Sequence, residues 1–64
     1  MENKTERAFY KIRYVGEDCD FFEPNKIYLC VGEVVAGPQK GSIFVIDERG
    51  VDYLYKAENF ERVG

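Results

Sequence analysis

The sequence contains no histidine and no tryptophan, and it has only one serine and two cysteines among its 64 residues. Without histidine, a Ser–His or Cys–His nucleophile pair cannot form, and a zinc site would lack half of its usual ligand types. Carboxylates remain at Asp47, Glu48 and Asp52, but a tight turn offers no cleft that could raise their pKa, so we expect them to be solvated. We therefore expect no catalytic residues, no metal site and no cofactor, and a protein that is not an enzyme.

Long apolar runs are also missing. No stretch of about 18 apolar residues exists, so the sequence predicts no membrane span. The first seven residues, MENKTER, contain no apolar core of a secretory signal, which favours a cytoplasmic protein with reduced thiols. We expect Cys30, which lies in a strand pattern, to be buried, and Cys19, which lies in a loop, to be more open. A disulfide between them is the alternative if the chain is secreted.

Positive charge is scarce, because nine Lys and Arg residues stand against twelve Asp and Glu, a net charge of −3. This sign opposes the phosphate neutralisation that drives most non-specific nucleic-acid binding. The basic residues available to nucleic acid are dispersed, at Lys11, Arg13, Lys26 and Lys40. Carboxylates gather more closely, at Glu17, Asp18, Asp20 and Glu23. Their spacing lacks the central glycine and distant glutamate of a calcium loop, so we expect at most weak calcium binding and instead a basic protein partner.

What the sequence has in abundance is β-branched and aromatic residues, which make up 22 of the 64, whereas Leu and Ala together supply five. This balance disfavours a helical bundle and predicts an all-β protein. A domain this small buries only about 60% of the surface of its unfolded chain. Most of the ten aromatic side chains are therefore expected to form the core.

Alternation of apolar and polar residues predicts five strands, at residues 9–15, 26–35, 42–47, 51–56 and 61–63. Gly32 inside the second strand indicates a bulge or bend, and Gly50 supplies the positive φ of a tight hairpin turn. Residues 57–60 are expected to form one 3₁₀ turn. Residues 1–7 show no periodicity and are expected to be a flexible tail, so that the single domain spans residues 8–63. Residues 16–25 form a long first loop.

This layout, together with Y-V-G-E, N-K-I-Y and F-V-I-D-E-R-G-V-D-Y-L-Y-K-A-E-N-F-E-R-V, resembles that of a group of small bacterial SH3-like proteins. The resemblance covers residues 8–63. It implies a small five-stranded SH3-like barrel with a 3₁₀ turn before the last strand. It implies no activity, because the biochemical role of that group is unassigned.

SH3 domains bind proline-rich peptides in an aromatic groove. This sequence departs from their pattern, because Ser42-Ile43-Phe44 stands where their tryptophan lies and A-E-N-F replaces the P-S-N-Y type of turn. Phe21, Phe22 and Phe60 are the aromatic residues that match the rest of that groove. Because two adjacent loop residues cannot easily both be buried, we expect Phe21 or Phe22 to remain partly exposed.

The sequence therefore suggests a non-enzymatic protein-interaction module. We expect its contact surface to combine eight residues: Glu17, Asp18, Asp20, Phe21, Phe22, Glu23, Tyr55 and Phe60. The partner would be an unidentified protein, for instance one with a basic segment. The alternative is a nucleic-acid-binding SH3-like domain that uses the dispersed basic residues. A homodimer formed through an unpaired strand edge is a further possibility.

Overall fold

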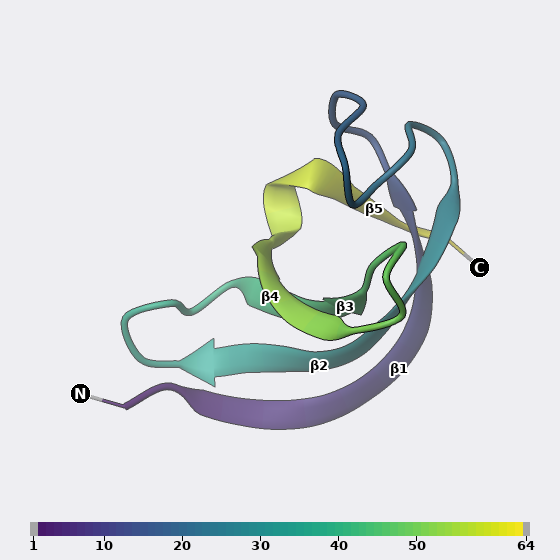
Figure 1. Cartoon of the computed structure of the whole chain (residues 1–64). Coiled ribbons are helices and arrows are strands. Elements are labelled where there is room, and N and C mark those ends of the chain that lie inside the picture. The colour runs from purple at the N-terminus through teal and green to yellow at the C-terminus, as the bar shows by residue number, and fades with distance from the viewer. Residues whose placement is uncertain (1, 64) are drawn as a thin grey trace.

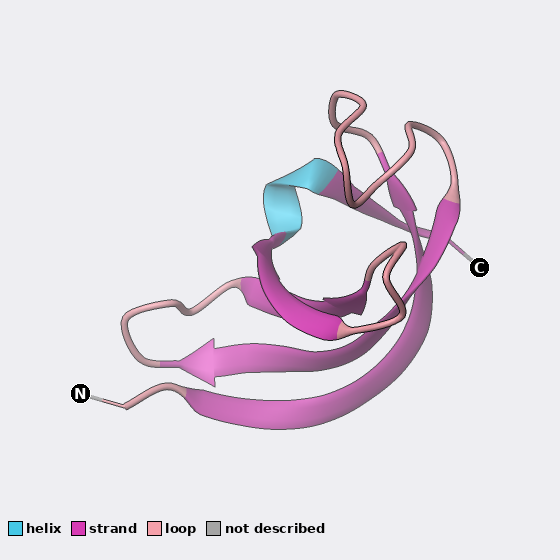
Figure 2. Ribbon diagram, in the orientation of Figure 1, coloured by secondary structure: helices cyan, strands magenta, loops and turns pink. Residues whose placement is uncertain are grey.

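The computed structural model describes residues 2–63 and shows an all-β chain in which five antiparallel strands form one sheet. The strands follow one another in the order β4-β3-β2-β1-β5 across the sheet. A single 3₁₀ turn, η1, precedes the last strand (Figures 1 and 2). The bounds of the elements are β1 Lys4–Tyr14, β2 Ile27–Ala36, β3 Ser42–Ile46, β4 Asp52–Lys56, η1 Ala57–Asn59 and β5 Phe60–Val63.

The first strand begins earlier than the sequence pattern predicts. Residues 4–7 were expected to lie in a tail, but they belong to β1 and pair with the second half of β2, for example Arg7 with Gly32 and Lys4 with Ala36. The alternation of apolar and polar residues is absent here because all four side chains are exposed. Backbone pairing with β2 defines this part of the strand, and a hydrophobic pattern cannot reveal such pairing.

The two longest strands are bent where their registers shift. The pairing of β1 with β2 is interrupted between Arg7 and Tyr10, and that of β2 with β3 between Cys30 and Gly32. Such bulges bend a strand and increase its twist. Figure 1 shows β1 and β2 curving together around the rest of the chain. The predicted irregularity at Gly32 is confirmed, and a side chain there would press against the Phe44 ring, since an added Cβ would lie 3.3 Å from it.

The connection between β3 and β4 is a short turn that contains Gly50, as predicted. Gly50 has φ of 78°, and its amide donates a hydrogen bond to the carbonyl of Asp47 at 2.9 Å. The Asp47 amide in turn donates to the carbonyl of Val51 at 3.1 Å. A short hairpin connection that uses a glycine with positive φ is common, and Gly50 specifies it locally.

The core lies on the inner face of the curved sheet. Every strand from β1 to β3 contributes alternate residues to it, and the buried cluster consists of Ile12, Tyr14, Phe22, Tyr28, Cys30, Ile43 and Val45. Cys30 is fully buried and Cys19 is exposed, which confirms both expectations, and both thiols are free. One member of the cluster, Phe22, comes from the first loop and from no strand.

Candidate functional site

Phe22 fills the centre of the inner face, where the first loop folds back onto the sheet. Its ring centroid lies 4.7 Å from that of Tyr55, 4.9 Å from Tyr28, 5.0 Å from Tyr14 and 5.2 Å from Phe60. Only 3% of the residue is exposed. The expectation that Phe22 contacts a partner is therefore wrong: the ring is a core residue, because the curved sheet leaves a central space that no strand side chain fills.

Tyr55 and Phe60 are half-buried residues that pack against the same core. Tyr55 lies on β4, and its hydroxyl donates to Asp47 at 2.9 Å. Phe60 begins β5, and its ring lies 5.5 Å from that of Tyr14. The structure thus brings Phe22, Tyr55 and Phe60 together, as one aromatic cluster, but this cluster contributes mainly to stability.

Phe21 points the other way and remains partly exposed, at 37%, so the expectation that one of the two phenylalanines stays accessible is confirmed. The guanidinium carbon of Arg49 lies 4.0 Å from the centre of its ring, a cation–π contact. The Glu48 amide donates to the Phe21 carbonyl at 3.0 Å. The first loop is therefore attached to the tip of the β3–β4 hairpin by side-chain and backbone contacts.

Asp47 anchors this hairpin from within. Its side chain is completely buried, whereas the sequence suggested a solvated carboxylate. Arg49 donates to it through its side chain at 2.8 Å and through its backbone amide at 2.9 Å. These contacts, helped by the hydroxyl of Tyr55, hold the pKa of the Asp47 carboxyl well below its ordinary value against the opposing effect of burial. A carboxylate in a tight turn can thus be buried when a cation from the same turn pairs with it.

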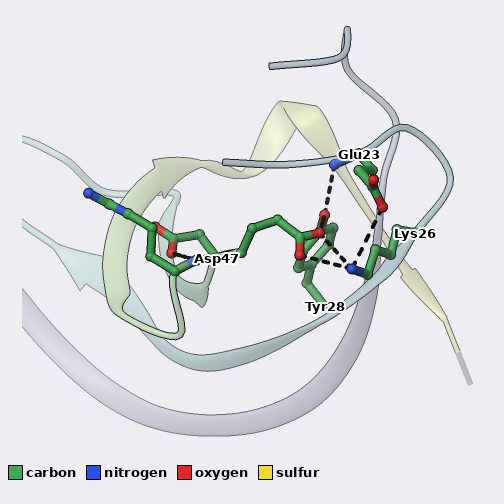
Figure 3. A network of polar contacts seen from close by, with 6 residues as sticks. Glu23, Lys26, Tyr28 and Asp47 are labelled. Atoms are coloured by element: carbon green, nitrogen blue, oxygen red, sulfur yellow. Dashed lines mark hydrogen bonds and ion pairs between the residues drawn. The ribbon is translucent and has the colours of Figure 1, made fainter. Parts of the chain in front are cut away.

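Glu48 is the centre of a second polar cluster, which Figure 3 shows between the hairpin and the end of the first loop. Its carboxylate accepts hydrogen bonds from Lys26 at 2.7 Å and from the Tyr28 hydroxyl at 2.6 Å. The Tyr28 hydroxyl also accepts from the Glu23 amide at 2.7 Å, and the Glu23 carboxylate lies 3.7 Å from Lys26. The hydrogen bonds from Lys26 and Tyr28 lower the pKa of Glu48. Glu23, one of the expected contact residues, is thus already paired.

The other three carboxylates of the first loop are different. Glu17, Asp18 and Asp20 are exposed, and within residues 2–63 no cation lies within ion-pair distance of them. The backbone around them is nevertheless held, because the Tyr14 hydroxyl donates to the Glu17 carbonyl at 2.6 Å and the Cys19 amide donates to the Phe22 carbonyl at 3.2 Å. We call these three residues the acidic face.

Tyr53 is the surface residue that the sequence reasoning missed. It pairs with Val45 and so lies on the inner side of β4, yet 60% of it is exposed, because the core ends at the neighbouring Tyr55. The two tyrosine rings are 6.0 Å apart. The signal was present in the sequence as two tyrosines on one face of a short strand, of which an edge strand can bury only one.

The four basic residues considered for nucleic-acid binding are not gathered in the structure. Arg13 forms an ion pair with Glu61 at 3.4 Å, and Lys26 is engaged by Glu48. Lys11 lies on β1, and Lys40 lies in the loop between β2 and β3. Nucleic-acid binding stays an expectation from the sequence. The placement of these four residues does not support a shared basic patch.

The described chain, residues 2–63, contains only one helical element, the three-residue turn η1, and no helix in it is long and apolar enough to cross a membrane. Over the same residues, no group of three His, Cys, Asp or Glu side chains is placed to hold a metal ion. No protein-family model matches the chain, and no curated protein or solved structure is found to be similar to it.

Proposed function

We propose that this protein is a non-enzymatic interaction module that binds a basic segment of another protein. The contact surface consists of the acidic face with two accessible aromatic residues, Phe21 and Tyr53. The observation that carries the proposal is the contrast in pairing at this end of the molecule. Asp47, Glu48 and Glu23 are paired with Arg49 and Lys26, whereas the three carboxylates of the acidic face have no cation within ion-pair distance in residues 2–63.

The acidic face is carried by a loop that is fixed in advance. Phe22 is buried in the core, and the Phe21 backbone is bonded to the hairpin, so binding does not require the loop to be ordered first. Such preorganisation lowers the entropic cost of association. Phe21 and Tyr53 add flat apolar surface on which the stems of lysine and arginine side chains can pack. A segment that alternates basic and small residues suits this combination.

The proposal also includes the closure of the sheet into a barrel. We infer an SH3-like barrel, as in the small bacterial proteins that the sequence resembles. It is supported by the strand order and by η1, which joins the two edge strands β4 and β5 directly. The contact between the Val15 amide and the Asn59 carbonyl, at 2.9 Å, brings that connection against the end of β1. We likewise propose that the protein is cytoplasmic.

The test is a chemical-shift titration of the isotope-labelled protein with a synthetic peptide of alternating lysine and alanine. We expect shifts centred on the acidic face, Phe21 and Tyr53, which weaken between low ionic strength and about 0.15 M salt. A matched peptide of alternating glutamate and alanine should produce none. Shifts spread evenly over the surface would contradict the proposal, and so would stronger binding of single-stranded DNA or RNA than of the basic peptide.

A matched pair of variants separates a specific surface from simple charge attraction. The first variant neutralises the acidic face with Glu17→Gln, Asp18→Asn and Asp20→Asn. The second removes the same charge elsewhere, from the exposed residues Glu2, Glu6 and Glu58, each changed to Gln. We expect the first variant to lose at least about tenfold in affinity for the basic peptide and the second to lose much less. Equal losses would show that only net charge matters and would overturn the assignment of the surface.

A further inference from the structure

The inner face of the sheet is densely packed beside the first loop and hollow at the opposite end. Phe22 fills the packed end. Toward the loop between β2 and β3, residues 37–41, the inner face borders an open cavity of about 380 Å³. Ile43 of the core and the adjoining Tyr10 and Ala57 form part of its lining. A cavity of this size lies in the lower part of the range that small-molecule sites occupy.

Glu33 of β2 contributes a carboxylate to this cavity. It is paired with the core residue Ile43, and paired residues share a face, so the half-buried Glu33 side chain lies on the inner face. Its Oε2 atom accepts a hydrogen bond from the Tyr10 hydroxyl at 2.8 Å. Within residues 2–63, Oε1 accepts no hydrogen bond and no cation lies within ion-pair distance of the carboxylate. A cation in the cavity would offset the cost of partly burying this charge.

Tyr10, which donates to Glu33, is itself held in place. The guanidinium carbon of Arg62 lies 4.2 Å from the centre of the Tyr10 ring, a cation–π contact. Burial raises the pKa of the Tyr10 hydroxyl, so the hydroxyl keeps its proton and remains a donor. Arg62 is not among the residues that line the cavity. The Glu33 carboxylate is therefore fixed by a hydrogen bond but left without an ion-pair partner in the described chain.

Lys40, in the loop between β2 and β3, contributes the opposite charge to the same cavity. Its side chain is exposed, which places the ammonium group at the rim. Within residues 2–63 it forms no ion pair with Glu33 or with another carboxylate. Val35, Ile43 and Ala57 add apolar surface to the lining. The cavity thus combines a fixed carboxylate, a flexible ammonium group and an apolar wall.

We propose that this cavity binds a small ω-amino acid, a molecule with an ammonium and a carboxylate group at opposite ends of a short apolar chain. The ammonium group pairs with Glu33, the chain lies against Tyr10 and Ile43, and the carboxylate faces Lys40. A simple cation is repelled by Lys40 and a simple anion by Glu33, so the dipolar molecule is the complementary one. Because both charges are partly solvated, we expect a dissociation constant on the order of 1 mM.

A chemical-shift titration of the isotope-labelled protein with 6-aminohexanoate tests the proposal. Hexylamine and hexanoate are the matched probes, because each keeps the apolar chain and one of the two charges. We expect saturable shifts at the amides of Tyr10, Glu33 and Ala57, and binding of 6-aminohexanoate at least about fivefold tighter than of either matched probe. The absence of saturable shifts around the cavity would overturn the proposal. Equal affinity for the three probes would overturn it too, because the two charges would then have no part in binding.

Two variants with different effects on the probes provide the sharper test. Glu33→Gln keeps the size of the side chain and an acceptor for Tyr10, and it should weaken both 6-aminohexanoate and hexylamine by at least about fivefold. Lys40→Gln replaces an exposed residue, and it should weaken 6-aminohexanoate but strengthen hexylamine, because it removes the cation at the rim. If Lys40→Gln changed the affinity for both probes in the same direction, the proposed orientation of the ligand would be wrong.

Glu17→Gln and Lys11→Gln are the controls, since they make the same changes in charge at exposed residues outside the cavity. Neither should alter the binding of 6-aminohexanoate, and losses as large as those of the cavity variants would show that only net charge matters. The cavity and the acidic face share no residue, and Figure 1 shows the β2–β3 loop and the first loop at opposite ends of the molecule. Failure of ω-amino acid binding therefore leaves the proposed peptide-binding surface unaffected, and the reverse also holds.

Discussion

The two halves of the loop between β1 and β2, residues 16–20 and 21–26, differ both in composition and in their relation to the rest of the molecule. In the second half, Phe22 is a core residue, Phe21 packs against Arg49, and Lys26 is bound by Glu48. In the first half, the carboxylates are exposed and unpaired within the described chain. One loop can therefore supply both part of the core of a very small domain and a surface that the core leaves free.

The largest effect on stability is expected at Phe22. Phe22→Ala removes the ring at the centre of the aromatic cluster and should lower the free energy of unfolding by about 3–5 kcal/mol. A domain of this size has a total stability of only about 3–10 kcal/mol, so this variant can be unfolded. Phe22→Leu keeps part of the apolar side chain, so it should destabilise the protein less than Phe22→Ala and should leave it folded enough to be measured.

Phe21→Ala is the matched control for that experiment, and urea denaturation followed by circular dichroism is the measurement. Its ring is partly exposed and packs against one cation, so we expect a loss of less than about 1 kcal/mol. If Phe21→Ala destabilised the protein as much as Phe22→Ala, the two halves of the loop would not differ in the way described.

A smaller loss of stability is expected from a substitution in the β3–β4 hairpin, which holds the second half of the loop. Asp47→Ala removes the acceptor for the Arg49 amide, the Arg49 side chain and the Tyr55 hydroxyl. The urea midpoint should fall, though by less than for Phe22→Ala, because no large cavity is created. Asp52→Asn, at an exposed carboxylate of the same hairpin, is the control and should leave the midpoint unchanged. Equal effects would show that Asp47 has no special part in holding the loop.

Acid should destabilise the protein through the same hairpin. The pKa values of Asp47 and Glu48 are lowered in the folded protein by Arg49 and Lys26, respectively. Their stabilising contribution is fully present above the unfolded-state values, near pH 4, and is lost as the pH falls through the lower folded-state values. Thermal unfolding should therefore give a steady melting temperature from pH 7 to about pH 5 and a decline below about pH 4. The decline should be shallower in Asp47→Asn, and an identical profile for this variant would contradict the assignment.

The smallest effect on stability is expected in the first half of the loop. Neutralising Glu17, Asp18 and Asp20 removes no contact within the described chain, so the free energy of unfolding should change by no more than about 0.5 kcal/mol per site. Any change should be toward greater stability, because three like charges lie close together. A marked loss in thermal unfolding would mean that the acidic face supports the fold, and its role as a free surface would then be untenable.

Much of the fold follows from the sequence, and the reasons are local. The order of five strands, the turn at Gly50 and the 3₁₀ turn are each specified by neighbouring residues. The start of β1 at Lys4 could not be predicted, since it depends on pairing with residues near position 36. Dependence on residues distant in the sequence also limits what could be predicted of the candidate site. The exposure of Phe21 or Phe22 could be expected, but which one enters the core depends on a space formed by four distant strands.

Amide hydrogen exchange across the first loop tests the division of the loop most directly. The Glu23 and Asn25 amides donate hydrogen bonds to the Tyr28 hydroxyl and the Tyr14 carbonyl, at 2.7 and 2.8 Å. Within residues 2–63 the Asp18 and Asp20 amides have no such acceptor. Glu23 and Asn25 should therefore exchange at least about tenfold more slowly than Asp18 and Asp20, after correction for intrinsic rates. Uniformly fast exchange over residues 16–26 would contradict the account.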